Sequence, residues 1–166
     1  QADEPFLSRI LHKYSIKNVT GLNILPLAIY RDPFDIITHL LVGSEGTLAF
    51  LSEFTMKTGK DYPFKASAML YFNDIKEACR AVVAMKKGPV MGAELLDKKS
   101  LESVNDPTGR GLTAVLTETM ADTKEELYGQ IEQIEGILSA FKTAVPVKFT
   151  DKEEEYAPYW AVRSGI

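Results

Sequence analysis

The segment that decides the fold runs from Lys65 to Lys87 and reads "KASAMLYFNDIKEACRAVVAMKK". Its first part, "KASAMLYF", is apolar and short, which predicts a strand. Asp74 is placed to cap the N-terminus of the helix that follows, and the lysines at the end suit a last helical turn. In this helix apolar side chains recur at helical spacing, at Ile75, Ala78, Cys79, Val82 and Val83. The segment therefore predicts a strand followed by an amphipathic helix.

The same alternation continues downstream to residue 150. A second strand is predicted in "PVMGAELL", a third in "LTAVLTETM" and a fourth in "VPVKF", with a short helix from Asp97 after the second strand. A longer helix lies between the last two strands, and Thr123 with Glu126 fits its capping box. Strand, helix, strand, strand, helix, strand is the order of a ferredoxin-like α+β fold, with the helices on one face of an antiparallel sheet.

Upstream of residue 64 the pattern is less regular. "EPFLSRILHKY" and "RDPFDIITHLLV" both have helical spacing, and the second helix should begin after Asp32 and end at Gly43. The stretch from Ser15 to Tyr30 keeps no single period and predicts an irregular connection. "TLAFLSEFTMKT" alternates, which predicts a half-buried strand with one apolar side formed by Leu48, Phe50, Phe54 and Met56. The turn-rich "GKDYPF", residues 59–64, predicts a domain boundary.

Composition excludes several classes of function. The chain has 166 residues and a formal net charge of −4, without the clustered basic residues that nucleic-acid binding requires. One cysteine, Cys79, cannot form an intrachain disulfide, and its place in the helix pattern predicts a buried structural thiol. Two histidines, His12 and His39, cannot form a His-rich metal site, so no metal is expected. No apolar run reaches the ~20 residues of a membrane span, and no signal peptide is visible, which predicts a cytoplasmic protein.

The segment "GSEGT", Gly43–Thr47, separates two apolar stretches and is the first candidate site. Its glycines permit backbone conformations with positive φ and a close approach to a ligand. Successive backbone N–H groups in such a turn can also bind an anion or a carbonyl group. The alternative is an ordinary helix C-cap followed by a turn.

Two further candidates are polar or aromatic clusters. In "KYSIKNVTGLN", Lys17 and Thr20 are suited to hold a carboxylate, although a solvent-exposed polar loop has the same composition. In "EEEYAPYWAVRSGI", Arg163 lies among aromatic residues, where a guanidinium can bind a carboxylate with two hydrogen bonds. The alternative there is a surface ion pair with the preceding glutamates, residues 153–155.

Four motifs together resemble a known family: "IKNVTGLN", "DPFDIITHLLVGSEGTLAFLSE", "GAELLDKKSLESV" and "YWAVRSGI". Their order and spacing are similar to those of FAD-linked oxidases of the vanillyl-alcohol-oxidase type. Within that family the chain looks most similar to bacterial D-2-hydroxyacid dehydrogenases that contain FAD and an iron–sulfur centre, such as those acting on D-lactate or D-2-hydroxyglutarate. The resemblance covers nearly the whole chain.

The resemblance implies a domain organisation. Residues 1–60 would be the C-terminal piece of a FAD-binding domain, and residues 61–166 an incomplete substrate-capping domain. It also implies roles for residues. Gly43, Ser44, Glu45, Gly46, Thr47 and Phe50 would lie at the flavin, while Lys17, Thr20 and Arg163 would contact the substrate. Two positions depart from the family pattern: Leu22 replaces a tyrosine, which removes a hydroxyl and an aromatic ring, and Ala49 replaces a glycine.

The chain is therefore expected to be an internal fragment, because the FAD phosphate loop, the His-rich segment and the iron–sulfur cysteines of the family are not in it. Its parent would be a FAD-dependent dehydrogenase that oxidises a D-2-hydroxy acid to a 2-oxo acid. Electrons would pass to an iron–sulfur centre or a quinone, and the protein would be cytoplasmic or peripheral on the inner face of the cell membrane. The catalytic base stays unassigned, and the fragment alone is expected to be inactive. The rival hypothesis is a non-catalytic ferredoxin-like module that binds a ligand.

Overall fold

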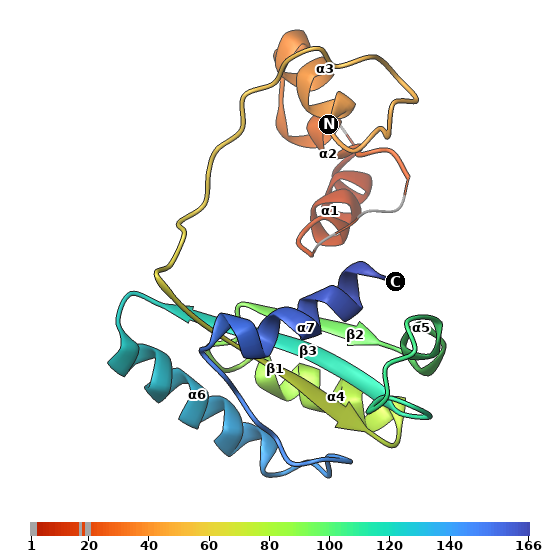
Figure 1. The fold of residues 1–166 in the computed structure, drawn as a ribbon. Coiled ribbons are helices and arrows are strands. Elements are labelled where there is room, and N and C mark those ends of the chain that lie inside the picture. The colour runs from red at the N-terminus through yellow and green to blue at the C-terminus, as the bar shows by residue number, and fades with distance from the viewer. Residues whose placement is uncertain (1–2, 17, 19–20) are drawn as a thin grey trace. The chain divides into compact units, whose positions relative to one another are not determined.

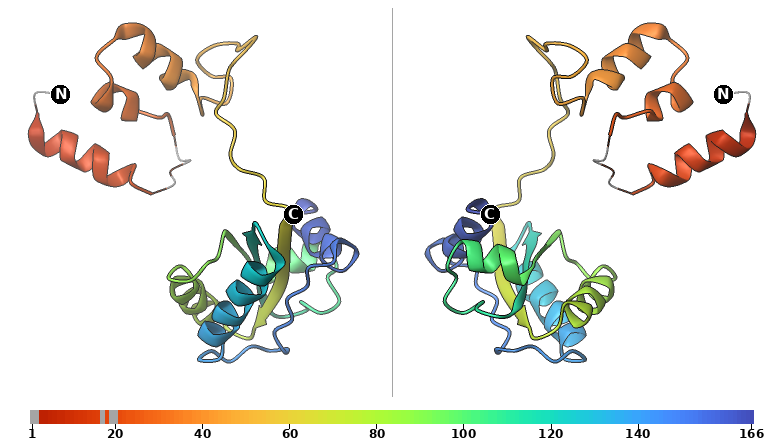
Figure 2. Two further views of the ribbon diagram at one scale, coloured as in Figure 1. Left: turned by 90° about the vertical axis from the view of Figure 1, so that its left-hand side faces the viewer. Right: turned by 90° about the vertical axis from the view of Figure 1, so that its right-hand side faces the viewer.

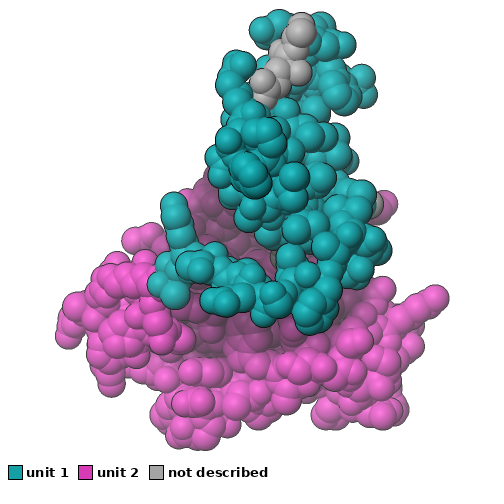
Figure 3. Space-filling view, turned by 90° about the horizontal axis from the view of Figure 1, so that it is seen from above, with its two compact units in different colours: residues 1–58 teal, residues 59–166 magenta. Residues whose placement is uncertain are grey.

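The chain forms two compact units, residues 1–58 and 59–166, which Figure 3 distinguishes by colour. The coordinates are those of a computed structural model that describes residues 3–16, 18 and 21–166. The first unit is helical in its described part, and the second contains the sheet (Figure 1). The assignment of residues 1–60 to a FAD-binding domain and of residues 61–166 to a capping domain stays a prediction.

The described helices of the first unit are α1 (Glu4–Lys13), α2 (Leu25–Ile29) and α3 (Pro33–Leu41). Side chains cap the N-termini of α1 and α3, whereas α2 begins without a side-chain cap. The Asp3 carboxylate accepts a hydrogen bond from the Phe6 amide at 3.0 Å, and Asp32 accepts from Phe34 at 2.9 Å. These bonds satisfy backbone donors that a helix N-terminus leaves free. The helix α2 is a correction, because its segment was expected to be irregular.

The prediction of a strand over residues 47–58 is wrong. The described backbone there forms no strand, and Phe50, Phe54 and Met56 are 91%, 69% and 72% exposed. Alternating polarity indicates which side of an extended chain prefers burial, but a strand also needs a neighbour to accept its hydrogen bonds. Within the described residues no segment pairs with this one.

In the second unit the described strands form one antiparallel sheet. Along the chain the elements are β1 (Phe64–Phe72), α4 (Ile75–Met85), β2 (Gly92–Leu96), α5 (Lys98–Ser103), β3 (Thr113–Ala121), α6 (Lys124–Leu138) and α7 (Glu153–Ser164). The order of strands is β1-β3-β2, so β3 is central and pairs antiparallel with both others. The α+β class with an antiparallel sheet is thus confirmed.

Both faces of this sheet are covered by helices. On one face Leu70, Phe72 and Val115 pack against α4 and α6. On the other face Met69, Tyr71, Ala114 and Leu116 pack with Leu101 of α5 and with Tyr159, Trp160 and Val162 of α7. Figures 1 and 2 show the resulting layers, with α4 and α6 on one side of the sheet and α7 on the other.

The two helices of the predicted order, α4 and α6, do share one face of the sheet, but α7, which the sequence interpretation did not include, covers the other face. The second cover is explained by β1, where the alternate residues Met69 and Tyr71 are buried as well. A strand that is apolar on both faces needs a cover on each of them. The helix α7 supplies the second cover.

The fourth strand expected in residues 145–149 is also wrong, although its segment lies beside β1. The backbone of Thr150 exchanges hydrogen bonds with Ser67, each 3.0 Å long, and the Ala144 amide donates to the Tyr71 carbonyl at 2.7 Å. Between these contacts stands Pro146, which has no N–H to donate to a neighbouring strand. The segment therefore follows the edge of β1 without forming a continuous ladder.

The expectation that Cys79 is buried is wrong as well, since this thiol is exposed. The helix α4 turns Ala78, Ala81 and Met85 toward the sheet, and all three are fully buried. Cys79 follows Ala78 directly, about 100° further around the helix, and so lies at the margin of the contact. The sequence predicted correctly that α4 has an apolar face. That face is centred on Ala78 and Ala81, and Cys79 is outside it.

The two-faced core predicts a large difference between a buried and an exposed leucine in the same sheet. Leu70 in β1 is 1% exposed and Leu95 in β2 is 41% exposed. Replacement of Leu70 by alanine should lower the free energy of unfolding by about 2–5 kcal/mol, because it removes buried methyl groups and leaves a cavity.

The same replacement at Leu95 should cost less than about 1 kcal/mol. Urea unfolding followed by the fluorescence of Trp160, the only tryptophan of the chain, measures both variants. Equal losses would contradict the assignment of Leu70 to the core.

Candidate functional site

The loop after α3 is held in left-handed backbone conformations. Gly43, Glu45 and Gly46 have φ angles of 82°, 51° and 75°. The Thr47 amide and hydroxyl both donate to the Ser44 carbonyl, at 2.9 and 2.6 Å. Glycine adopts positive φ at little cost, whereas a residue with a Cβ such as Glu45 pays about 1–2 kcal/mol. The loop is therefore a specific, partly strained turn and more than a simple helix end.

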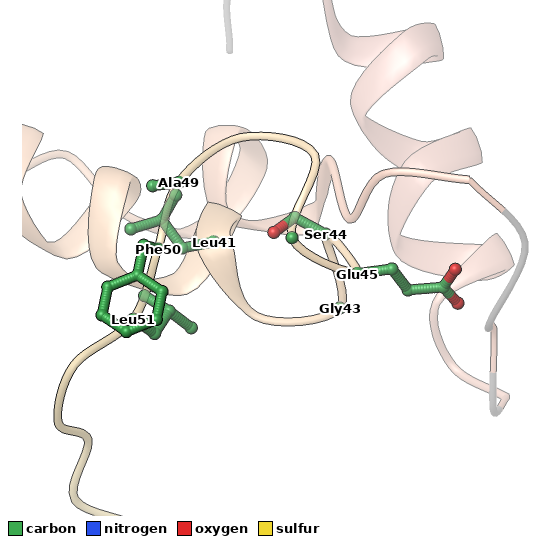
Figure 4. Close-up of a pocket in the computed structure, with 8 residues that line it drawn as sticks. Leu41, Gly43, Ser44, Glu45, Ala49, Phe50 and Leu51 are labelled. Atoms are coloured by element: carbon green, nitrogen blue, oxygen red, sulfur yellow. The ribbon is translucent and has the colours of Figure 1, made fainter.

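This loop borders a hollow of about 390 Å³ in the first unit. Leu41, Ala49, Phe50 and Leu51 form its apolar side, and the loop backbone from Gly43 to Gly46 lines the rest. Figure 4 shows Phe50 beside Leu41 and Leu51, while the Glu45 carboxylate points away from them. A flat aromatic group could lie against such a surface, with its polar edge toward backbone.

The structure also brings the two polar loops of this unit together. A second hollow of about 290 Å³ is lined by Asn18 and Gly21 from one loop and by Gly43 and Glu45 from the other. Tyr14, the C-cap residue of α1, holds the first loop in place, since its hydroxyl donates to the Leu22 carbonyl at 3.2 Å and accepts from the Ile24 amide at 3.1 Å. Lys17 and Thr20, the substrate contacts expected here, lie outside the described residues.

In the second unit polar contacts hold α7 to the sheet and to the segment that runs along the edge of β1. The Trp160 indole N–H donates to the Ser67 hydroxyl of β1 at 3.2 Å. Near the start of the helix, Glu155 accepts hydrogen bonds from Thr150 at 3.0 Å and from Lys148 at 3.3 Å. Between these anchors stands Pro158, inside the helix.

Arg163 lies in the last turn of α7, and its partner is not one of the helix glutamates. Its Nε–H donates to Oε2 of Glu94 in β2 at 2.7 Å, and neither side chain is buried. This charge-assisted bond raises the pKa of Arg163 above its ordinary value, so the guanidinium stays charged. The alternative pairing with residues 153–155 is thus corrected, and Glu155 is committed to Thr150, Lys148 and Lys152.

Three polar residues on the α7 face were not singled out from the sequence. The Tyr71 hydroxyl donates to Asp106 Oδ2 at 2.9 Å, and burial followed by this carboxylate raises the tyrosine pKa. Glu118, central on β3, has its pKa raised by burial, while Lys65 and Ser67 oppose the shift. Glu94 is the third. They could have been found in the sequence as charged or hydroxyl-bearing side chains within strands that are otherwise mostly apolar.

The described residues contain no group of three or more histidine, cysteine, aspartate or glutamate side chains that could hold a metal ion. Among the same residues, no helix combines the length and apolar character needed to cross a membrane.

Residues 63–166 match the family model of FAD linked oxidases, C-terminal domain. The chain belongs to this family. It is also 28% identical over 130 residues to a mitochondrial D-lactate dehydrogenase [cytochrome] of Arabidopsis thaliana, a match that covers 76% of this chain and 23% of that protein. The chain thus spans about a quarter of the length of this curated relative.

The family match covers the second unit, and FAD is the cofactor that it implies. The loop of the first unit can be tested for fit to a flavin by the space beside its glycines. A Cβ built on Gly43 or Gly46 would meet no atom within 4 Å, so this side of the loop is open to an approaching group. With the apolar side at Leu41, Phe50 and Leu51, the residues fit the ring of a flavin. The roles of Gly43, Ser44, Glu45, Gly46, Thr47 and Phe50 as cofactor contacts stay predictions.

The hydrogen bonds of Glu155 predict how the attachment of α7 depends on pH. The contacts from Lys152, Thr150 and Lys148 lower the Glu155 pKa from 4.5 to about 2. A carboxyl group whose folded pKa is lowered stabilises the fold above its unfolded pKa, and this contribution is lost as the pH falls toward the folded pKa. Wild type should therefore exceed Glu155→Gln in stability by a constant margin above about pH 5 and by a shrinking one below it.

Urea unfolding between pH 7 and pH 3, followed by Trp160 fluorescence, measures this margin. Glu154→Gln is the matched control, because Glu154 is exposed on the same helical turn. A margin for Glu155→Gln that is unchanged at pH 3 would contradict the assignment.

Proposed function

We propose that the full-length protein is a FAD-dependent dehydrogenase that oxidises a D-2-hydroxy acid to the corresponding 2-oxo acid. The observation that carries the proposal is the match of residues 63–166 to the C-terminal domain of FAD linked oxidases. The curated relative is named as a D-lactate dehydrogenase, which makes D-lactate the first substrate to test. The non-catalytic ligand-binding module remains the outcome if no hydroxy acid reacts.

In this proposal Arg163 binds the carboxylate of the substrate. A guanidinium offers a planar set of donors that matches the two oxygens of a carboxylate, and Arg163 is exposed enough for a small molecule to reach it. Lys17 and Thr20 are proposed as further carboxylate contacts. A bound flavin would accept the hydride from the carbinol carbon. The base that takes the hydroxyl proton is not assigned to a residue of this chain.

The electron acceptor is proposed to be an iron–sulfur centre or a quinone, and the protein to be cytoplasmic or peripheral on the inner face of the cell membrane. The relative's name gives a cytochrome as acceptor and the mitochondrion as location. A cytochrome is therefore a third acceptor to test beside the other two.

The substrate class is tested by reduction of the flavin in the full-length protein under anaerobic conditions. D-lactate, D-2-hydroxyglutarate and longer D-2-hydroxy acids should bleach the flavin absorbance, and the L-enantiomers serve as controls. If every D-acid leaves the flavin oxidised while dithionite reduces it, the proposed substrate class is wrong.

The Arg163→Lys variant tests the carboxylate contact in the same assay. Lysine keeps the positive charge but loses the planar pair of donors. A hydrogen bond to a charged group contributes about 1.5–3 kcal/mol, so kcat/KM should fall by roughly 10- to 100-fold. Arg110→Lys is the control, since Arg110 lies exposed in the turn before β3 and should leave kcat/KM unchanged. Equal rates for both variants would remove Arg163 from the substrate site.

The glycines of the loop offer a matched test of the flavin contact. Gly46 and Gly111 have φ angles of 75° and 77°, and an added Cβ would meet nothing within 4 Å at either position. Alanine should therefore strain the two backbones equally, by about 1–2 kcal/mol. In the full-length protein Gly46→Ala should lower FAD affinity as well, because the new methyl group would occupy the face open to the flavin. FAD retention on dilution, measured by flavin fluorescence, should be normal in Gly111→Ala.

A further inference from the structure

We propose that Glu94 is a positioning residue that orients the Arg163 guanidinium, so that its two terminal nitrogens face the substrate carboxylate. This inference rests on the proposed function and adds to it a residue that acts through Arg163 without touching substrate. Its basis is the single contact between the Arg163 Nε–H and Glu94 Oε2, at 2.7 Å, which links the last turn of α7 to β2.

The geometry of a guanidinium determines which of its edges stays available when Glu94 is bonded to it. The group has five N–H donors in one plane and can bind a carboxylate through its Nε side or through its two Nη nitrogens. Glu94 is bonded at the Nε side. The Nη end is then the edge available for a second carboxylate. With side chains 50% and 42% exposed, the pair is accessible to a small anion.

The backbones of Glu94 and Arg163 are both held by regular structure, so the hydrogen bond between their side chains fixes the orientation of the guanidinium. Glu94 lies on β2, where its neighbour across the ladder is Leu116 of the central strand. Arg163 lies three residues after Trp160, whose indole N–H is hydrogen-bonded to Ser67. Its neighbour Val162 packs on the face of the sheet that α7 covers. A free arginine side chain samples many rotamers, and restricting them before binding lowers the entropy that binding costs.

A purely structural role for the pair is the competing explanation. Exposed ion pairs contribute little to stability, so the loss of Glu94 should barely move the unfolding midpoint. A positioning role predicts instead a change in substrate binding. Because the substrate carboxylate is bound in the ground state and the transition state alike, the change should appear in KM with kcat preserved.

The test is a series of Glu94 variants in the full-length flavoprotein. Glu94→Ala removes the acceptor and should raise KM for the D-2-hydroxy acid by about 3- to 10-fold. Glu94→Gln keeps an oxygen at the same reach and should restore KM to within about twofold of wild type. Glu102→Ala is the control, because it removes another half-exposed ion pair, with Lys98, and should leave KM unchanged.

A rescue experiment addresses the same contact directly. In Arg163→Ala, millimolar guanidinium can occupy the space beside Glu94 and should restore part of the lost activity. In the double variant Glu94→Ala with Arg163→Ala, the ion has no anchor, and the rescue should disappear. Equal rescue in the single and double variants would overturn the proposal.

The two proposals fail differently. If D-acids reduce the flavin and Arg163→Lys raises KM, but Glu94→Ala does not, the positioning role is wrong and the function stands. If no D-acid reacts, the function is wrong, and binding of oxalate measured by calorimetry tests the pair without turnover. Oxalate binding that is lost in Arg163→Ala and weakened in Glu94→Ala then supports the positioning role, while equal binding in all variants overturns it.

Discussion

The backbone pairing of the central strand β3 is the constraint on which the second unit depends. All nine residues of β1 are paired with β3 on one side, and β2 is paired with it on the other. Because both faces of β1 are apolar and buried, this pairing also fixes two separate layers of helices. One layer, α4 with α6, forms the larger core. The other, α5 with α7, carries the polar groups to which a function can be attached.

The second layer shows how packing and chemistry are combined in one helix. The Trp160 ring packs on the sheet, and its indole N–H donates to the Ser67 hydroxyl, so both contacts hold the same part of α7 against β1. Arg163 lies one turn further, at the end of the helix, where the core gives way to solvent. A cation in a last helical turn is also favoured by the helix dipole. The apolar contacts of the preceding residues in α7 thus hold the backbone at Arg163, while its guanidinium remains accessible to solvent.

The helix caps and the α+β class of this chain could be predicted from sequence, whereas the partners of particular strands and side chains far apart in the sequence could not. The caps at Asp32, Asp74 and Thr123 depend on neighbouring residues, and each is found where the sequence puts it. The prediction of a strand over residues 47–58 failed because alternating polarity does not supply a neighbouring strand to pair with. The partner of Arg163 was missed for a similar reason, since Glu94 is 69 residues away in the sequence. The segment Gly43–Thr47 was predicted correctly as a turn, and its role as a flavin contact stays a prediction.

Pro158 gives α7 a mechanical property. A proline inside a helix removes one backbone hydrogen bond and weakens the rod at that point. The half before it is tied down by Glu155 and the half after it by Trp160, so each half has its own attachment. A displacement at the start of the helix would then be absorbed at the proline and would not be transmitted as a lever to Arg163.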